Sequence, residues 1–131
     1  MKIISSVYEL TVFLSKHSKK EALGFIPTMG ALHQGHISLV KKSLNQNELS
    51  LCSIFVNPTQ FNNKTDLKNY PNSLEEDLKL LEETGCDVVF TPSIKEIYPN
   101  GLPTKVYDFG VLDKVMEGAG RPGHFNGVAM V

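Results

Sequence analysis

The chain has 131 residues, of which 41% are hydrophobic and 21% are charged, and its formal net charge is −1 at pH 7. This length and composition predict one globular domain, or part of a larger protein, with a hydrophobic core of its own. The near-neutral charge argues against nucleic acid and against an anionic membrane surface as partners.

The sequence predicts a cytoplasmic protein. No apolar run has the length of a membrane span, and the first six residues lack the apolar core and the cleavage site of a signal peptide. The two cysteines, Cys52 and Cys86, lie far apart in apolar surroundings. We therefore expect reduced, buried thiols, and a disulfide between them is the alternative.

The first half of the chain alternates between helical and strand-like patterns. Val7 begins a run of apolar residues at helical spacing after the candidate caps Ser5 and Ser6. Short continuous apolar runs predict buried strands. In chain order, the predicted elements are a helix over residues 7–14 that ends near residues 17–20, a strand over 23–26, a helix over 35–44 and a strand over 49–56.

The second half contains fewer regular elements. Ser73, with Glu76 three residues later, predicts a capping box at a helix start, and Gly85 is suited to end that helix. In chain order, the predictions are a loop over residues 57–63, a helix over 73–84, a strand over 87–90, one helical turn over 94–97, an edge strand over 105–109, a short helix over 111–116 and a glycine-rich loop over 118–127.

Strands that alternate with helices predict an α/β fold with a parallel sheet covered on both faces. Right-handed crossovers then give a doubly wound, Rossmann-like arrangement, which we expect to occupy residues 1–131 as one domain. In such sheets ligands bind at the carboxyl ends of the strands, and residues 28–36 and 57–60 both reach that edge. The sequence therefore predicts a binding site there.

The most informative segment is the run PTMGALHQGH from Pro27 to His36. It joins a predicted strand to a predicted helix through a loop that contains Gly30 and Gly35, whose backbone permits close approach of a ligand. Free backbone N–H groups and the positive end of the helix dipole would face an anion here. The segment therefore predicts a nucleotide phosphate site.

Two histidines in this run, His33 and His36, would project from the same side of the first helical turn. Their imidazoles are suited to bind triphosphate oxygens and to offset the charge that develops as pyrophosphate leaves, and Gly35 adds no side chain that shields the helix start. This H-x-G-H pattern resembles the signature of Rossmann-like nucleotidyltransferases, which transfer adenylyl or cytidylyl groups. Two alternatives remain: an incidental surface loop, and a zinc pair, which lacks neighbouring cysteine or carboxylate ligands.

Polar residues elsewhere are weaker candidates. Asn57 and Gln60 follow the second predicted strand, and their amides are suited to hold a hydroxyl and a carboxylate; alternatively, they cap the backbone of the loop. Arg121 and His124 offer a cation and an imidazole in a glycine-rich segment, for which a plain surface loop is the alternative. A solvated helix face is predicted for two acidic runs, residues 75–77 and 82–83.

Several longer segments accompany the PTMGALHQGH run. They are residues 53–61, SIFVNPTQF; residues 66–71, DLKNYP; residues 93–101, SIKEIYPNG; and residues 117–127, EGAGRPGHFNG. In this order and spacing they resemble the pantothenate synthetase (pantoate–β-alanine ligase) family, and the resemblance covers essentially the whole chain.

The resemblance implies a two-step ligase reaction. ATP and pantoate give a pantoyl-adenylate and pyrophosphate, and the amine of β-alanine then attacks the acyl-adenylate to give pantothenate and AMP. A magnesium ion (Mg2+) on the phosphates and a homodimer are implied as well. A closed cavity would keep water away from the mixed anhydride.

The same resemblance implies roles for individual residues. The ATP site would be lined by Met29, Gly30, Ala31, Leu32, His33, Gln34, Gly35 and His36. Among these, His36 is the implied proton donor and His33 the implied phosphate ligand. The residues implied for pantoate and β-alanine are Gln60, Asn57, Pro27, Thr28 and Met29. Tyr70 falls in the segment that would cover the cavity, and no side chain of this chain is implied as a metal ligand.

The chain differs from the resembled family in length. It ends in the apolar run GVAMV, and family members continue with a Gly-Glu-Lys-Asp-type stretch, a second glutamine and a Ser-Ser-Arg loop, so we expect the front part of a longer protein. Without that lysine and arginine we expect weak ATP binding and negligible turnover. The alternatives are a nucleotide-binding module without catalysis and a cytidylyltransferase that prefers CTP, which residues 57–60 disfavour.

Overall fold

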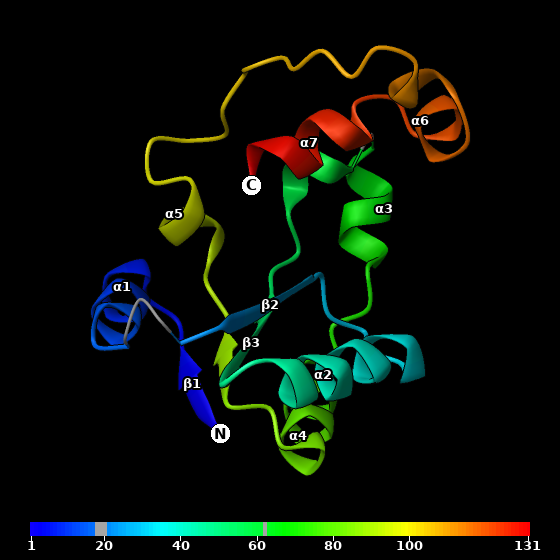
Figure 1. Ribbon diagram of the computed structural model, residues 1–131. Helices are drawn as coiled ribbons and strands as arrows, with labels where there is room; N and C mark the ends of the chain where they lie inside the picture. The colour runs from blue at the N-terminus through cyan, green and yellow to red at the C-terminus, as the bar shows by residue number, and fades with distance from the viewer. Residues whose placement is uncertain (18–20, 62) are drawn as a thin grey trace.

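The computed structural model, shown in Figure 1, describes residues 1–17, 21–61 and 63–131. Its centre is a parallel sheet of four strands in the order β1-β4-β3-β2. The strands are β1 (Lys2–Ile4), β2 (Leu23–Thr28), β3 (Leu49–Ile54) and β4 (Val88–Phe90). The predicted α/β class with a parallel sheet is confirmed.

Helices connect and cover these strands. The α-helices are α1 (Val7–Ser15), α2 (Gln34–Gln46), α3 (Lys64–Asn69), α4 (Leu74–Thr84), α5 (Ile94–Ile97), α6 (Glu117–Gly120) and α7 (His124–Met130). Two short 3-10 helices are η1 (Pro58–Gln60) and η2 (Leu112–Lys114). Among the helices in the described ranges, none combines the length and the apolar character needed to cross a membrane.

The chain winds across the sheet in two directions. From β2 through β3 to β4 it moves steadily toward one edge, whereas β1 lies beyond β4 and the chain returns from there through α1 to β2. Figure 1 shows α2 and α4 beside each other, with α1 on the other side of the sheet. This is the doubly wound, Rossmann-like arrangement that the sequence predicts.

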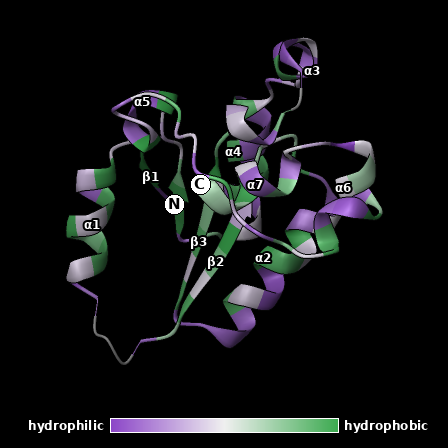
Figure 2. Cartoon of the chain, turned by 90° about the horizontal axis from the view of Figure 1, so that it is seen from above, coloured by the Kyte–Doolittle hydropathy of each residue, from purple (hydrophilic) through white to green (hydrophobic). Residues whose placement is uncertain are grey.

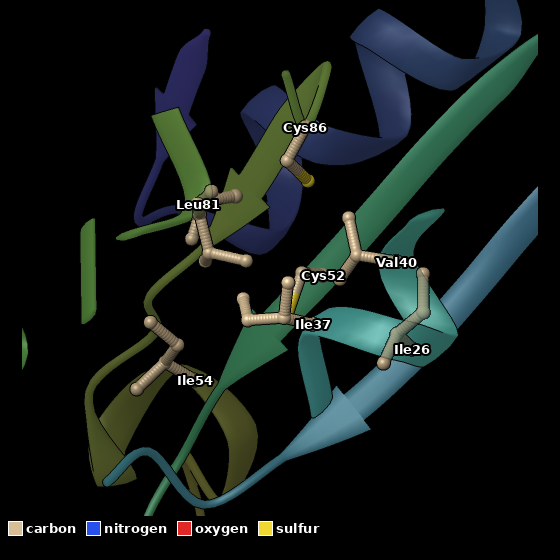
Figure 3. Close-up of a cluster of buried hydrophobic side chains, with 8 residues drawn as sticks. Ile26, Ile37, Val40, Cys52, Ile54, Leu81 and Cys86 are labelled. Atoms are coloured by element: carbon tan, nitrogen blue, oxygen red, sulfur yellow. The ribbon is translucent and has the colours of Figure 1, made fainter. Parts of the chain in front are cut away.

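Two clusters of buried side chains explain why helices cover both faces. The cluster under α2 and α4 contains Ile26, Ile37, Val40, Cys52, Ile54, Leu81, Cys86 and Val89 (Figure 3). The cluster on the opposite face contains Ile4, Leu51, Val88 and Phe90, against which Leu10 and Phe13 of α1 pack. Because side chains alternate along a strand, neighbouring residues of β3 serve opposite clusters. In Figure 2 the strands are mostly green, whereas α2 carries many purple residues as well.

Several local predictions are confirmed. The side chain of Ser6 caps α1 by accepting a hydrogen bond from the Glu9 amide at 3.4 Å. Gly85 ends α4 in the left-handed conformation, with φ of 89°. Cys52 and Cys86 are buried and free, and burial raises the pKa of the Cys52 thiol to about 12. Both thiols are therefore inert core groups.

Two strands differ from the sequence-based expectation. No predicted element corresponds to β1, because three residues are too few to show an alternating pattern and the place of β1 is fixed by pairing with β4. The predicted edge strand over residues 105–109 does not form. The Tyr107 amide instead donates to the Asn126 side chain at 2.7 Å, so a side-chain hydrogen bond holds this segment in place of the backbone hydrogen bonds of a strand.

Several predicted loops contain short helices. The loop predicted over residues 57–63 contains η1, with residue 62 outside the described ranges, and the glycine-rich loop predicted over residues 118–127 contains α6 and the start of α7. The helix predicted over residues 111–116 is reduced to η2. Tertiary contacts stabilise these turns where propensity alone does not, as for α7, which packs on η1.

Two predicted helix ends also differ. Ser73 is the N-cap of α4, but its side chain makes no capping bond, and its hydroxyl donates instead to Asp77 at 3.2 Å. The predicted capping box with Glu76 is therefore wrong. Helix α1 ends at Ser15, earlier than the predicted end near residues 17–20, of which residues 18–20 lie outside the described ranges.

Candidate functional site

The loop that follows β2 begins at an edge of the sheet. Strand β2 extends to Thr28, two residues beyond the predicted end, and includes Pro27, which an edge strand tolerates because its missing N–H removes no ladder bond. The Thr28 hydroxyl donates to the Ser53 carbonyl of β3 at 2.7 Å and accepts from the Gly30 amide at 3.2 Å. The sheet therefore fixes the first residues of the loop.

The backbone turns sharply just after Met29, which is half-buried. Gly30 has φ of 82° and Ala31 has φ of 51°. The left-handed region suits glycine, but it costs about 1 kcal/mol for a residue with a Cβ. Other contacts must therefore hold Ala31 in this conformation.

Those contacts come from Asp77 of α4. Its Oδ2 atom accepts from the Ala31 amide at 2.9 Å, and its Oδ1 atom accepts from the Leu32 amide at 2.7 Å. Asp77 is only 4% exposed, so the predicted solvated helix face is wrong for this residue and right for its exposed neighbours Glu75 and Glu76. The signal that could have found it is its position four residues before the buried Leu81, on the same helix face.

The two histidines cap the start of α2. The Nδ1 atom of His33, the N-cap, accepts from the Gly35 amide at 3.1 Å, and the Nδ1 atom of His36 accepts from the His33 amide at 3.2 Å. The ring centroids lie 4.1 Å apart. An Nδ1 atom that accepts a hydrogen bond carries no proton, so each neutral ring carries its proton on Nε2.

The prediction that free backbone N–H groups face an anion needs correction. Amides of this loop donate to partners within the protein, namely those of Gly30, Ala31, Leu32, His33 and Gly35. The internal carboxylate and the two imidazoles satisfy groups that a helix N-terminus ordinarily leaves open. The Nε2–H groups of the two histidines are further donors at this loop.

The environment of His36 favours its neutral form. Burial and the neighbouring His33 ring lower the pKa of His36 below its ordinary value of 6.5, and the Asp77 carboxylate partly opposes this shift. His33 itself is exposed, as is Gln34. Near neutral pH, the His36 ring therefore retains both its capping bond through Nδ1 and a donor on Nε2.

The second predicted segment forms the turn η1 at the end of β3. Asn57 is 1% exposed. Its Nδ2 atom donates to Gln60 Oε1 at 2.9 Å and to the Gly127 carbonyl at 3.0 Å. Its Oδ1 atom accepts from the Thr59 hydroxyl at 2.8 Å and from the Tyr98 hydroxyl at 2.9 Å. The side chain of Asn57 therefore holds this turn together, as the alternative of loop capping predicts, while the Gln60 side chain is only half-buried.

Helix α7 holds the turn from outside. A Cβ atom added to Gly127 would lie 2.0 Å from the Thr59 carbonyl oxygen, so glycine permits the close approach of α7. His124 Nδ1 lies 3.1 Å from the Gln60 carbonyl oxygen. The segment predicted as a glycine-rich loop therefore packs against this turn, through Gly127 and through His124, one of its two candidate residues.

A third segment lies beside this turn. Tyr70 ends α3 and contacts Phe61 edge to face, with ring centroids 5.5 Å apart. Tyr70 and Arg121 line a cavity of about 680 Å³, and Arg121 pairs with Glu117 at 3.3 Å. Burial and the Asp77 carboxylate raise the pKa of Tyr70, and Arg121 partly opposes this. Tyr70 is therefore a neutral phenol beside a cation.

The described residues include no group of three His, Cys, Asp or Glu side chains that could hold a metal ion. The zinc alternative is weakened further at the histidine pair, because both Nδ1 atoms already accept hydrogen bonds from the backbone.

Comparison with known proteins identifies relatives along the whole chain. A family model described as pantoate-beta-alanine ligase matches residues 2–131. Curated pantothenate synthetases from Cytophaga hutchinsonii and Bacteroides fragilis are 50% and 51% identical to this chain over 129 and 132 residues. These matches cover 98% and 100% of this chain but only 45% and 46% of the relatives. The chain therefore spans about half the length of these curated relatives.

Solved structures share the fold. The crystal structure of pantoate-beta-alanine ligase from Francisella tularensis, complexed with beta-gamma ATP and beta-alanine, has a TM-score of 0.94 and 43% identity, and the match covers 99% of this chain and 50% of that chain. Pantothenate synthetase from Thermus thermophilus has a TM-score of 0.87 and 45% identity, with coverage of 99% and 46%. From the match over residues 2–131 and from relatives that are about half identical, it follows that the chain belongs to the pantoate–β-alanine ligase family.

Proposed function

We propose that residues 1–131 form the nucleotide- and pantoate-binding domain of a cytoplasmic ligase that joins pantoate to β-alanine with ATP. The observation that carries this proposal is the pair of histidine caps, which directs two Nε2–H donors away from the start of α2. Membership of the family supports it, as does the Francisella tularensis relative, whose structure is complexed with beta-gamma ATP and beta-alanine.

In the first step, a carboxylate oxygen of pantoate attacks the α-phosphorus of ATP, and the bond from that phosphorus to the bridging oxygen of pyrophosphate breaks. Met29 to His36 would line the ATP site. His33 would donate a hydrogen bond from Nε2 to the phosphates, and His36, the implied proton donor, would donate a hydrogen bond from its Nε2–H group to the departing pyrophosphate. These hydrogen bonds would strengthen as negative charge develops on the leaving group.

A magnesium ion bound to the phosphates would screen their negative charge. The protein's own part in the step is to orient the phosphates and to exclude water. Tyr70, beside the cavity that Arg121 also lines, is our candidate for the residue that covers the bound substrates.

Pantoate would lie against the turn after β3. Since Gln60 Oε1 accepts from Asn57, the Nε2 group of Gln60 is oriented as a donor for the hydroxyl or carboxylate oxygens of pantoate. Pro27, Thr28 and Met29 would form the other wall. Asn57 is fully engaged within the protein, so we assign it the role of positioning Gln60 and not of direct substrate contact.

In the second step, the neutral amine of β-alanine attacks the acyl carbon of the pantoyl-adenylate, the bond from that carbon to the phosphate oxygen of AMP breaks, and the attacking nitrogen releases a proton to solvent as the amide forms. We assign Gln60 a contact with β-alanine as well. Effective reaction requires the two substrates to be held together without water, so the remaining half of the relatives' length is expected to contribute further walls and a homodimer.

The decisive experiment is an NMR titration of the imidazole resonances with MgATP and then pantoate, with CTP as the nucleotide control. We expect MgATP to shift His33 and His36 selectively, and pantoate to shift the side-chain amide of Gln60. His17 on the C-terminal side of α1, whose Nδ1 atom lies 3.1 Å from the Phe13 carbonyl oxygen, is a built-in reference that should not move. A stronger response to CTP than to ATP would instead favour a cytidylyltransferase.

The second candidate is a nucleotide-binding module without catalysis of its own. The chain spans about half of its relatives, and loss of a single group that stabilises the transition state typically lowers a rate by about 100- to 1,000-fold. We expect this chain alone to bind MgATP weakly and to form pantothenate at least that much more slowly than a full-length relative. A rate comparable to that of the relative would contradict this expectation.

A further inference from the structure

Asp77 carries an unusual set of hydrogen bonds for a carboxylate in a helix. It is 4% exposed and lies in the first turn of α4, beside the exposed Glu75 and Glu76. Its two oxygens accept from two consecutive backbone amides, those of Ala31 and Leu32, which lie 46 and 45 residues earlier in the chain. The Ser73 hydroxyl donates a third hydrogen bond at 3.2 Å.

The shape of the loop depends on this carboxylate. Consecutive amides converge on one anion when the backbone between them turns through the left-handed region, and such a concavity ordinarily binds a phosphate. Here φ is 82° at Gly30 and 51° at Ala31, and a Cβ at Gly30 would lie 3.0 Å from Asp77 Oδ2. The carboxylate of Asp77 thus occupies the concavity as an internal anion.

We propose that Asp77 is a positioning residue of the nucleotide loop, whose carboxylate holds the amides of Ala31 and Leu32 and so fixes the backbone that presents His33 and His36. The part of this inference that concerns the nucleotide rests on the proposed function. Leu32 directly precedes the N-cap His33, so a shift of its amide changes the geometry of both histidine caps. Three hydrogen-bond donors also partly neutralise the charge of the carboxylate, which limits its repulsion of an incoming polyanion.

The contact can be tested first in the unsubstituted chain, without any nucleotide. NMR detects scalar couplings across hydrogen bonds, and we expect couplings from the amide nitrogens of Ala31 and Leu32 to the side-chain carboxyl carbon of Asp77. Both amide protons should resonate downfield, as charge-assisted bonds require. Assigned amides that show neither coupling nor downfield shift would overturn the proposal, whatever the stability of any variant.

The role of the contact is tested by Asp77→Asn, which keeps the shape of the side chain but turns an NH2 group toward one of the two amides. Glu75→Gln is the matched control, because it removes the same charge from an exposed neighbour on the same turn. We expect Asp77→Asn to move the amide proton resonances of Ala31 and Leu32 upfield. We also expect it to shift the nitrogen-15 resonances of the Nδ1 atoms of His33 and His36, here called the cap signals, because these atoms accept the capping bonds. Glu75→Gln should leave all four resonances unchanged.

Nucleotide binding supplies the functional readout. We expect the Kd for MgATP to rise about tenfold in Asp77→Asn, the effect of one charge-assisted hydrogen bond, and to change less than about twofold in Glu75→Gln. A variant that unfolds at lower temperature but keeps its cap signals and its Kd would show that Asp77 serves only stability, which overturns the proposal.

The titration of His36 adds a second signature. Since the Asp77 carboxylate raises the pKa of His36 against the effects of burial and His33, we expect a lower pKa for His36 in Asp77→Asn than in Glu75→Gln. If MgATP shifts no imidazole in the unsubstituted chain, the proposed function fails. The couplings and the cap signals, recorded without nucleotide, still decide the role of Asp77.

Discussion

The two segments that leave neighbouring strands at the site are held in different ways. The loop after β2 is held by a charged group, the carboxylate of Asp77, and by two titratable rings. The turn after β3 is held by the neutral side chain of Asn57 and by close packing of α7. We therefore expect the loop to respond to pH and to charge, and the turn to respond to shape and to lost hydrogen bonds.

The largest effect is expected at the turn, for Asn57→Ala. This change removes the shared partner of the Tyr98 hydroxyl, the Thr59 hydroxyl and the Gly127 carbonyl, of which the last two keep a bond to each other at 3.2 Å, and a buried group that loses its partner costs about 1–3 kcal/mol. From that range we expect the free energy of unfolding to fall by about 4 kcal/mol, as measured by urea denaturation. Asn100→Ala, at an exposed position, is the control. A loss below about 1 kcal/mol would show that the network does not hold the turn.

A smaller loss is expected for Gly127→Ala, which tests packing alone. Alanine favours helices over glycine by about 1 kcal/mol, but here its Cβ would meet the Thr59 carbonyl oxygen at 2.0 Å and push α7 from η1. Overpacking of this kind typically costs about 1–3 kcal/mol, so we expect a net loss of about 2 kcal/mol. Gly120→Ala, whose Cβ would meet nothing within 4 Å, should be neutral or stabilising. Equal behaviour of the two variants in thermal unfolding would contradict the contact.

The loop is expected to show a modest dependence on pH through His36. His36 has a folded-state pKa below 6.5, so between that lowered pKa and 6.5 the unfolded chain binds more protons than the folded chain. Stability from this group is therefore complete above pH 6.5 and is lost as the pH falls through this window. We expect His36→Gln to remove this part of the dependence in urea denaturation at several pH values. Nitrogen-15 shifts should report protonated Nε2 and unprotonated Nδ1 on both site histidines at neutral pH.

The smallest effect is expected for Ser73→Ala. A true N-cap contributes about 1 kcal/mol, but the Ser73 side chain makes no capping bond and only donates to Asp77. We expect a loss of about 0.5 kcal/mol, below the loss for Ser6→Ala, where a real cap is removed. A larger loss of stability for Ser73→Ala than for Ser6→Ala would support the capping box that the sequence predicts.

Long, strongly patterned elements could be predicted from the sequence, and contact-dependent ones could not. The helix that begins near Gly35 and the buried strand that begins at Leu49 are marked by their own periodicity. Strand β1 and helix α7 are short, and each is stabilised by a partner distant in sequence, β4 and η1 respectively. Local pattern carries no information on such pairings.

The candidate site shows the same division. The histidine pair could be found because its spacing and its loop are local, and its ATP role stays a prediction until the titration is done. The role of Asp77 in holding the loop could not be predicted, because Asp77 lies in an acidic run that resembles a solvated helix face. Only its place on the same face of the helix as Leu81 distinguishes it from Glu75 and Glu76. The engagement of Asn57 could not be predicted either, since its partners include Tyr98 and Gly127, both far along the chain.

The tie between Ala31 and Asp77 also has a consequence for the order of folding. The two residues are 46 positions apart, and α2, β3 and α3 lie between them. During synthesis from the N-terminus, the loop leaves the ribosome well before Asp77. Contacts between residues so far apart in sequence form late in folding, because the intervening chain must first be ordered. The amides of Ala31 and Leu32 should therefore gain protection from hydrogen exchange only when α4 docks, together with the sheet and not with their own helix.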